Sequence, residues 1–289
     1  MNLEVIHAPG GPPLAACVYE PAVAARGNVV IGGAMGVVQD FYAPFAQWLS
    51  GQGWRVTTFD YRGSGRSAPP GGSLRGFRAD LFDWTADYAA VIDQAHAALP
   101  QAPLYLLGHS LGAQLPGLLR NQHKVSGLLS VAAGSGYWRQ NAPRLRRVVL
   151  LFWFVLVPLA TRLCGYFPGR RLGVVGNLPS GVVLQWRRWC LSPRYSVGAE
   201  GAAVRRRYAS VRFPVHALSV DDDELMTLPG IRSLVALYEN APSAVERIAP
   251  RQLGIGRLGH FGAFRREREA DLWPRLAQWL AGLATMRPA

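Results

Sequence analysis

Lysine and cysteine are scarce in this sequence. Lys124 is the only lysine, so arginine carries almost all of the net charge of +13 at pH 7. The three cysteines, Cys17, Cys164 and Cys190, are an odd number, stand far apart and lack the spacing of metal ligands. The chain also lacks the basic start and apolar run of a secretory signal. We therefore expect reduced thiols, no metal or other cofactor, and a cytoplasmic protein.

The arginines do not form a recognisable nucleic-acid-binding pattern. They occur as short clusters near residues 144–147, 205–207 and 265–268, without a binding motif between them. A nucleic-acid-binding protein normally combines a basic patch with a recognised module. We therefore expect no nucleic-acid partner. The oligomeric state is not indicated by the sequence.

A run long enough to cross a membrane is also missing. The most apolar stretch, residues 148–160, ends at Thr161 and Arg162 and falls short of the roughly twenty residues that a span needs. We expect this stretch to belong to a cap whose apolar face covers a substrate pocket. Because Arg144, Arg146 and Arg147 stand beside it, a peripheral membrane contact through the cap stays open as an alternative.

Short apolar segments alternate with amphipathic helical patterns through the first part of the chain. The apolar segments are residues 14–19, 29–31, 55–59, 104–107 and 128–133. The alternation stops after residue 134 and resumes at 215–220, and a final helix is expected over 272–283. This pattern predicts an α/β fold with a mostly parallel central sheet flanked by helices. Residues 1–133 and 211–289 would form the core, and residues 134–210 an inserted helical cap.

A candidate nucleophile stands in Gly108-His109-Ser110-Leu111-Gly112, which fits the G-x-S-x-G pattern of a nucleophile elbow. Glycines are needed on both sides because the chain turns sharply from a strand into a helix. The apolar segment 104–107 precedes the motif, and a helix over 111–120 is expected to follow, bent by Pro116. The alternative is an ordinary glycine-flanked turn.

A serine hydroxyl needs a base, and the base needs an acid. In this architecture the order along the chain is serine, acid, histidine. Of the six histidines, only His260 lies in a glycine-flanked loop between the last strand and the final helix. The acid should follow the strand at 215–220, where Asp221, Asp222 and Asp223 stand in a row. Asp222 lies three residues past Ser219, the small residue that closes the strand, and is our choice; the other two remain alternatives.

The remaining candidates concern the oxyanion and the pocket. Two backbone N–H groups should bind the oxyanion, one from Leu111 and one from the glycine-rich turn, at Ala34 or Met35. Trp153 and Trp186 are candidate pocket residues in the cap. Trp186 could instead pack the cap onto the core. For Arg62, in Asp60-Tyr61-Arg62-Gly63, we favour bracing of the loop over anchoring of a substrate carboxylate.

Together these stretches resemble the α/β-hydrolase superfamily. They are residues 31–42, 59–67, 108–115, 219–227 and 259–265, and the cap segments 134–138 and 185–190 share the likeness. More narrowly, they resemble bacterial hydrolases near the serine-aminopeptidase-like and monoacylglycerol-lipase-like branch. The resemblance covers nearly the whole chain and implies the fold and a Ser-Asp-His triad.

We therefore expect a serine hydrolase that forms a covalent acyl-enzyme on a small-molecule acyl substrate. The apolar cap favours carboxylic esters with a small to medium hydrophobic or lipid-like acyl group. One alternative is an acyltransferase or thioesterase with the same triad. The other is a catalytically silent scaffold that binds a membrane or an acidic partner.

Overall fold

An eight-stranded sheet forms the centre of the molecule. The structure is a computed structural model that describes residues 1–286. The strands, in spatial order, are β1 (Asn2–His7), β2 (Pro13–Tyr19), β4 (Arg55–Phe59), β3 (Asn28–Gly32), β5 (Leu104–His109), β6 (Gly127–Val131), β9 (Val215–Val220) and β10 (Ser243–Ile248). β1 pairs with β2 and β2 with β4 in antiparallel fashion, whereas all other neighbours are parallel. The predicted mostly parallel sheet is confirmed.

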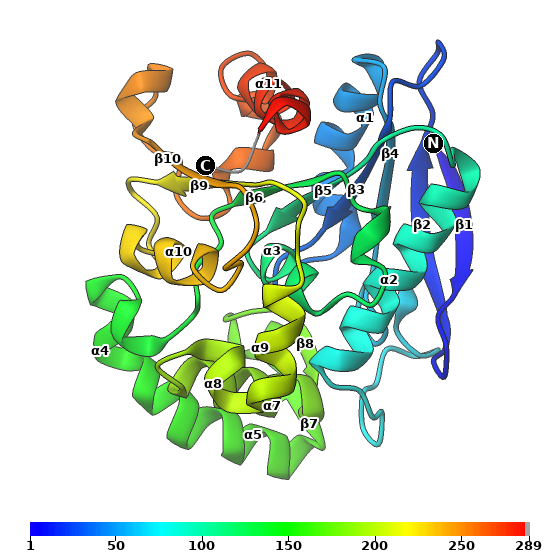
Figure 1. The fold of residues 1–289 in the computed structure, drawn as a ribbon. Helices are drawn as coiled ribbons and strands as arrows, with labels where there is room; N and C mark the ends of the chain where they lie inside the picture. Colours follow the sequence, from blue (N-terminus) through cyan, green and yellow to red (C-terminus); the bar gives the residue numbers. More distant parts are fainter. Residues whose placement is uncertain (287–289) are drawn as a thin grey trace.

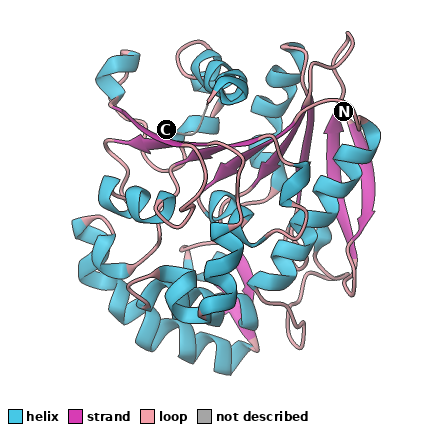
Figure 2. Cartoon of the chain, viewed as in Figure 1, coloured by secondary structure: helices cyan, strands magenta, loops and turns pink. Residues whose placement is uncertain are grey.

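Helices cover both faces of this sheet (Figures 1 and 2). α1 (Ala43–Gly51) and α11 (Trp273–Gly282) lie on one face, and α2 (Leu81–Ala98) and α10 (Leu228–Val235) lie on the other. The central strands are apolar without alternation because both faces are covered. In β3, Val29 and Ile31 join the apolar cluster under α1 and α11, whereas Val30 joins the cluster under α2.

Residues 134–210 lie between β6 and β9 and form a separate group of helices beside α2 (Figure 1). We refer to them as the insertion. Its elements are α4 (Pro143–Leu151), a π-helical segment (Phe152–Leu156), α5 (Val157–Cys164), β7 (Tyr166–Pro168), α6 (Gly169–Leu172), β8 (Asn177–Pro179), α7 (Ser180–Leu191), α8 (Tyr195–Glu200) and α9 (Ala202–Ala209). β7 and β8 pair as a small antiparallel hairpin.

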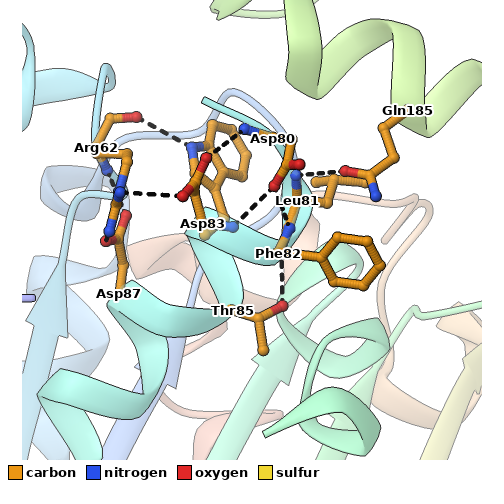
Figure 3. Close-up of polar contacts among 9 residues, drawn as sticks. Arg62, Asp80, Leu81, Phe82, Asp83, Thr85, Asp87 and Gln185 are labelled. Atoms are coloured by element: carbon orange, nitrogen blue, oxygen red, sulfur yellow. Dashed lines mark hydrogen bonds and ion pairs between the residues drawn. The ribbon is translucent and has the colours of Figure 1, made fainter. Parts of the chain in front are cut away.

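A side-chain contact joins the insertion to the core (Figure 3). Gln185 reaches from α7 to the start of α2, where its Oε1 accepts a hydrogen bond of 2.6 Å from the Leu81 N–H. The first N–H groups of a helix have no partner within the helix, so an outside acceptor satisfies one of them. Asp80 caps the same end by accepting from the N–H groups of Phe82 and Asp83.

α4, the π-helical segment and α5 run together as one helix of 22 residues from Pro143 to Cys164. At 1.5 Å per residue this helix is about 33 Å long, and it is long and apolar enough to cross a membrane by length and composition. The prediction that the run is too short is therefore wrong. The helix does not end at Thr161 but continues to Cys164, and the Thr161 carbonyl accepts the Gly165 N–H at 2.9 Å.

Candidate active site

The turn between β5 and α3 (Leu111–Gln114) holds Ser110 in a strained backbone conformation. Its φ is +51°, a region that residues with a side chain rarely adopt. The flanking glycines are required by close backbone approaches. A Cβ on Gly112 would lie 1.9 Å from the Gly32 carbonyl oxygen, and one on Gly108 would lie 2.5 Å from the Ala113 nitrogen. Ser110 is 8% exposed, and its position is that of a nucleophile elbow.

The helix after Ser110 is much shorter than expected. α3 ends at Gln114, and a 3-10 turn from Pro116 to Leu118 follows in place of the helix expected to residue 120. Pro116 has no N–H to continue the helical hydrogen bonds, so it ends the helix rather than bending it.

Three buried tyrosine hydroxyls bond to the end of this short helix. The Tyr238 hydroxyl donates to the Ala113 carbonyl at 3.1 Å, and the Tyr208 hydroxyl donates to the Gln114 carbonyl. The Tyr195 hydroxyl donates to the Gln114 side-chain oxygen at 2.7 Å. Tyr195 and Tyr208 belong to the insertion, so the insertion holds the segment that carries Ser110.

His260 pairs with Asp223. Its Nδ1 lies 2.8 Å from Asp223 Oδ2, and the His260 side chain is 2% exposed. The sequence-based choice of Asp222 is off by one residue. β9 spans Val215–Val220 as predicted, so the error came from counting three residues from Ser219; the Asp223 N–H bonds back to the Val220 carbonyl in the turn that follows the strand. The turn therefore brings the third aspartate of the row to the imidazole.

The acidic neighbours of Asp223 hold the backbone of the histidine loop. The two carboxylate oxygens of Asp222 accept from the Leu258 and Gly259 N–H groups, each at 3.0 Å. Glu224 accepts from the His260 N–H at 3.1 Å. Sequence reasoning missed this role. The signal was the run of four acidic residues, which is longer than one catalytic acid requires.

Of the two N–H groups proposed for the glycine-rich turn, one is hydrogen-bonded and the other is free within the described residues. The Ala34 N–H donates to the Tyr42 hydroxyl at 2.8 Å, so Ala34 is not available to an oxyanion. Within residues 1–286, no hydrogen bond engages the Met35 N–H. Leu111 is the first residue of α3, where an N–H has no partner within the helix. The structure thus corrects the assignment of Ala34 and leaves Met35 and Leu111.

His109, the residue before Ser110, contacts the histidine loop directly. Its Nε2 lies 3.0 Å from the His260 carbonyl oxygen, and the two rings lie 5.2 Å apart. Burial, and then the neighbouring His260, lower the pKa of His109 to about 3. The nucleophile elbow and the histidine loop therefore meet through a neutral, fully buried imidazole.

Arg62 is a bracing residue. Its Nη2 lies 2.6 Å from Asp87 Oδ1 and its Nη1 lies 3.2 Å from Asp83, both on α2 (Figure 3). The Trp84 indole N–H also donates to the Arg62 carbonyl at 3.0 Å. Because Arg62 is buried and its guanidinium is held by two carboxylates of α2, the preferred structural interpretation is confirmed.

The two tryptophans of the insertion meet edge to face. The ring centroids of Trp153 and Trp186 lie 4.9 Å apart, with the rings at 90°. Trp153 is 2% exposed and belongs to the apolar cluster that also contains Met35 and Leu111. The buried apolar core on the α2 face of the sheet, which we call the apolar layer, therefore extends from the candidate oxyanion donors to the long helix of the insertion.

Residues 1–286 contain no group of three or more His, Cys, Asp or Glu side chains arranged to hold a metal ion. A cavity of about 360 Å³ adjoins the histidine loop, and its wall includes His260, Phe261 and Arg265. What the arrangement offers chemically is a strained serine, a carboxylate-paired histidine and two free backbone donors. These are the parts that acyl transfer through a serine requires.

Known proteins share this architecture. Residues 24–166 match the family model described as serine aminopeptidase, S33. A soluble variant of monoglyceride lipase from Saccharomyces cerevisiae is 14% identical, with a TM-score of 0.69 over 98% of this chain and 95% of that one. A carboxyl esterase from Bacillus coagulans is 13% identical, with a TM-score of 0.68 over 98% of each chain.

The mouse α/β-hydrolase domain-containing protein 10 is 15% identical, with a TM-score of 0.59 over 98% of this chain and all of that one. No curated protein sequence matches the chain. At such low sequence identities the solved structures establish only the fold, and the matching family model is consistent with that fold. The chain therefore has the α/β-hydrolase fold, and residues 24–166 are similar in sequence to the serine aminopeptidase, S33 family.

Proposed function

We propose that the protein is a serine hydrolase that cleaves carboxylic esters through a covalent acyl-enzyme. Ser110 is the nucleophile, His260 the general base and Asp223 the acid. The observation that carries the proposal is the buried 2.8 Å contact between His260 and Asp223. The His260 carbonyl oxygen is also hydrogen-bonded to His109, the residue before Ser110. A carboxylate in this position holds the imidazole in one tautomer and stabilises the imidazolium that forms.

In the acylation half of the reaction, Ser110 Oγ bonds to the ester carbonyl carbon and its proton passes to His260 Nε2. The developing oxyanion accepts hydrogen bonds from the Leu111 and Met35 N–H groups. The bond to the leaving alcohol then breaks, and His260 returns the proton to the leaving oxygen. A water molecule then attacks the carbonyl carbon of the acyl-enzyme, giving a proton to His260, and His260 returns that proton to Ser110 Oγ as the acyl bond breaks. The products are the carboxylic acid and free Ser110.

The substrate class follows from the apolar layer. Within this proposal the insertion acts as a cap, and Trp153 and Trp186 line the site for the acyl chain. Met35 and Leu111, the candidate oxyanion donors, belong to the same apolar core as Trp153, and this apolar surrounding favours an uncharged acyl group. We therefore infer esters with a small to medium hydrophobic or lipid-like acyl group. The three free cysteines agree with the proposed cytoplasmic location.

The test combines p-nitrophenyl esters of graded chain length with labelling by a fluorophosphonate. We expect turnover and labelling in the wild type, and loss of labelling with a fall in kcat of about 10⁴- to 10⁶-fold in Ser110→Ala. An unchanged Ser110→Ala variant would overturn the proposal. Product analysis with an added alcohol separates hydrolysis from acyl transfer, and an acyl-thioester substrate tests the thioesterase alternative. A wild type that is never labelled would favour the silent scaffold.

A second proposal concerns peripheral contact of the insertion with a membrane. Six apolar side chains of the long helix are each at least half exposed: Val148, Leu151, Phe154, Val155, Leu159 and Leu163. Val149, Trp153, Val157 and Thr161 form a buried stripe at four-residue spacing on the same helix. Because this stripe packs inward, the helix suits a position in the plane of the membrane surface rather than across it.

Exposed arginines near the start of the helix, Arg144, Arg146 and Arg147, would meet anionic headgroups. We expect the protein to bind vesicles that contain phosphatidylglycerol more strongly than vesicles of phosphatidylcholine alone. A Leu151→Ser/Val155→Ser variant should lose about tenfold or more of its partition onto vesicles. The matched control is Leu3→Ser/Val5→Ser on β1, whose side chains are equally exposed but lie outside the insertion. Equal binding by both variants would contradict this proposal.

A further inference from the structure

His109 connects three segments of the site through its two ring nitrogens. Its Nε2 lies 3.0 Å from the His260 carbonyl oxygen, and its Nδ1 lies 2.9 Å from the Tyr42 hydroxyl. The Tyr42 oxygen in turn accepts the Ala34 N–H at 2.8 Å. The side chains of Tyr42 and His109 are both fully buried. We call this chain of hydrogen bonds, from Ala34 through Tyr42 and His109 to His260, the relay.

The chemistry of the partners sets the direction of each bond. A carbonyl oxygen can only accept, so the proton of the neutral imidazole must be on Nε2. Nδ1 is then an acceptor, and the Tyr42 hydroxyl donates its proton to it. The lone pairs of the Tyr42 oxygen remain for the Ala34 N–H. Each donor in the relay therefore has one acceptor, and only one tautomer of His109 satisfies all three bonds.

We propose that Tyr42 and His109 are positioning residues that lock the oxyanion turn and the histidine loop onto the nucleophile elbow. In the same role, the Tyr42 hydroxyl occupies the Ala34 N–H and leaves the Met35 N–H as the donor of that turn. The proposal rests on the proposed function, since it concerns the groups that would carry the ester hydrolysis. Both side chains are buried, so they act through the backbone they hold.

The contacts around the relay support this role. The Tyr42 ring packs edge to face on Phe264, and the His109 ring packs on Phe264 and Phe261. Phe261 and Phe264 follow His260 in the same loop. Aromatic packing and hydrogen bonding thus fix the loop from one side, while Asp222 and Glu224 fix it from the other.

The first test is Tyr42→Phe, which removes one hydroxyl and keeps the packing. We expect kcat to fall by about 10- to 100-fold while KM changes by less than about threefold, because a small misplacement of donors and base weakens the transition state. The matched control is Tyr61→Phe, since within residues 1–286 the buried Tyr61 hydroxyl has no hydrogen-bond partner. This control should keep the wild-type kcat. Wild-type kcat in Tyr42→Phe would overturn the proposal.

The second test is a double-mutant cycle with His109→Gln, whose shorter reach cannot serve both neighbours. Residues that act as one relay give non-additive losses. We therefore expect Tyr42→Phe/His109→Gln to have a kcat close to that of the worse single variant. A loss equal to the product of the two single losses would show independent roles and would overturn the relay.

The third test needs no turnover. In protein labelled with ¹⁵N-histidine, His109 should show a protonated Nε2 and an unprotonated, hydrogen-bonded Nδ1, assigned by its absence in His109→Gln. Tyr42→Phe should shift the Nδ1 resonance of His109 and leave its tautomer unchanged. An unshifted resonance would overturn the relay even in an active esterase. A shifted resonance in a protein that never hydrolyses esters would keep the relay, but would overturn the proposed function and the positioning role together.

Discussion

His260 Nδ1 lies 2.8 Å from Oδ2 of Asp223, the third residue in a run of four acidic side chains. The carboxylates on either side do not serve the imidazole ring. Asp222 and Glu224 accept hydrogen bonds from the backbone of residues 258–260 instead. Of the four carboxylates, Asp223 therefore faces the imidazole, Asp222 and Glu224 hold the loop on which the imidazole stands, and Asp221 pairs with Arg247.

This division predicts different costs for neighbouring substitutions. Asp223→Asn should lower kcat on a short p-nitrophenyl ester by about 10⁴-fold, because the imidazole loses the charge that fixes its tautomer and stabilises its protonated form. Asp222→Asn should lower kcat by about tenfold or less, since an amide oxygen can still accept one of the two backbone bonds. Steady-state kinetics on purified variants gives the comparison.

Asp221→Asn is the control for this series. Asp221 forms a partly exposed ion pair with Arg247 on β10, and within residues 1–286 no hydrogen bond or ion pair joins it to the histidine loop, so kcat should stay within about twofold of the wild type. If Asp222→Asn were inactive and Asp223→Asn active, the acid of the triad would be Asp222 and the assignment of Asp223 would be wrong.

The acid was hard to choose from the sequence for a physical reason. The type of residue and its loop could be predicted, since an acid had to follow the strand at 215–220. The register could not, because three successive aspartates differ only in where the strand ends and how the turn runs. Counting from Ser219 pointed to Asp222, whereas the last strand residue is Val220 and the turn after it presents Asp223 to the imidazole.

The pH dependence of stability should carry a signature of His109. Burial lowers its folded pKa to about 3, whereas a histidine in the unfolded chain has a pKa near 6.5. Between these values the unfolded state binds the proton and the folded state does not. The free energy of unfolding should therefore fall as the pH is lowered from about 7 to about 3.

Urea unfolding of the wild type and of His109→Gln at several pH values isolates this contribution. Burial raises the pKa values of Asp60 and Asp87, and those groups change the stability in the opposite sense. They are common to both proteins, so the difference between the two curves belongs to His109. The wild type should lose more stability on acidification than His109→Gln. Parallel curves would contradict the assignment.

The short helix after Ser110 gives a further prediction. Tyr208→Phe leaves the buried carbonyl of Gln114 without its hydroxyl donor, which should cost about 1–3 kcal/mol in the free energy of unfolding. Tyr61→Phe removes a buried hydroxyl without a partner in the described part of the chain and should not destabilise the protein. Equal stabilities of the two variants in urea would show that the Tyr208 bond contributes nothing.

These tyrosine contacts lay beyond sequence reasoning. Pro116 signalled an irregular helix, and the structure shows that it ends the helix altogether. The hydroxyls that bond to the end of this short helix come from residues 81 to 125 positions away in the chain, a separation that no local pattern encodes.

Strand β1 was not predicted, for a different reason. It is an edge strand in which only Ile6 is buried, so its apolar pattern is weak.

Selectivity for acyl chain length should depend on the tryptophan pair of the insertion. Trp186 is half-buried and packs edge to face on Trp153, so Trp186→Ala opens space beside the apolar layer that reaches Met35 and Leu111. We expect this variant to raise kcat/KM for long-chain p-nitrophenyl esters relative to acetate by about 10-fold, because each buried methylene contributes about 0.8 kcal/mol. Trp153→Phe, which keeps an aromatic ring, should shift the preference less.

The matched control is Trp48→Ala. Trp48 is a half-buried tryptophan of α1 on the opposite face of the sheet, so this variant should leave the chain-length preference unchanged. Thermal unfolding of each variant separates a change of pocket from a loss of fold. A uniform loss on all esters in a folded Trp186→Ala protein would show that this tryptophan packs the insertion and does not shape the acyl site.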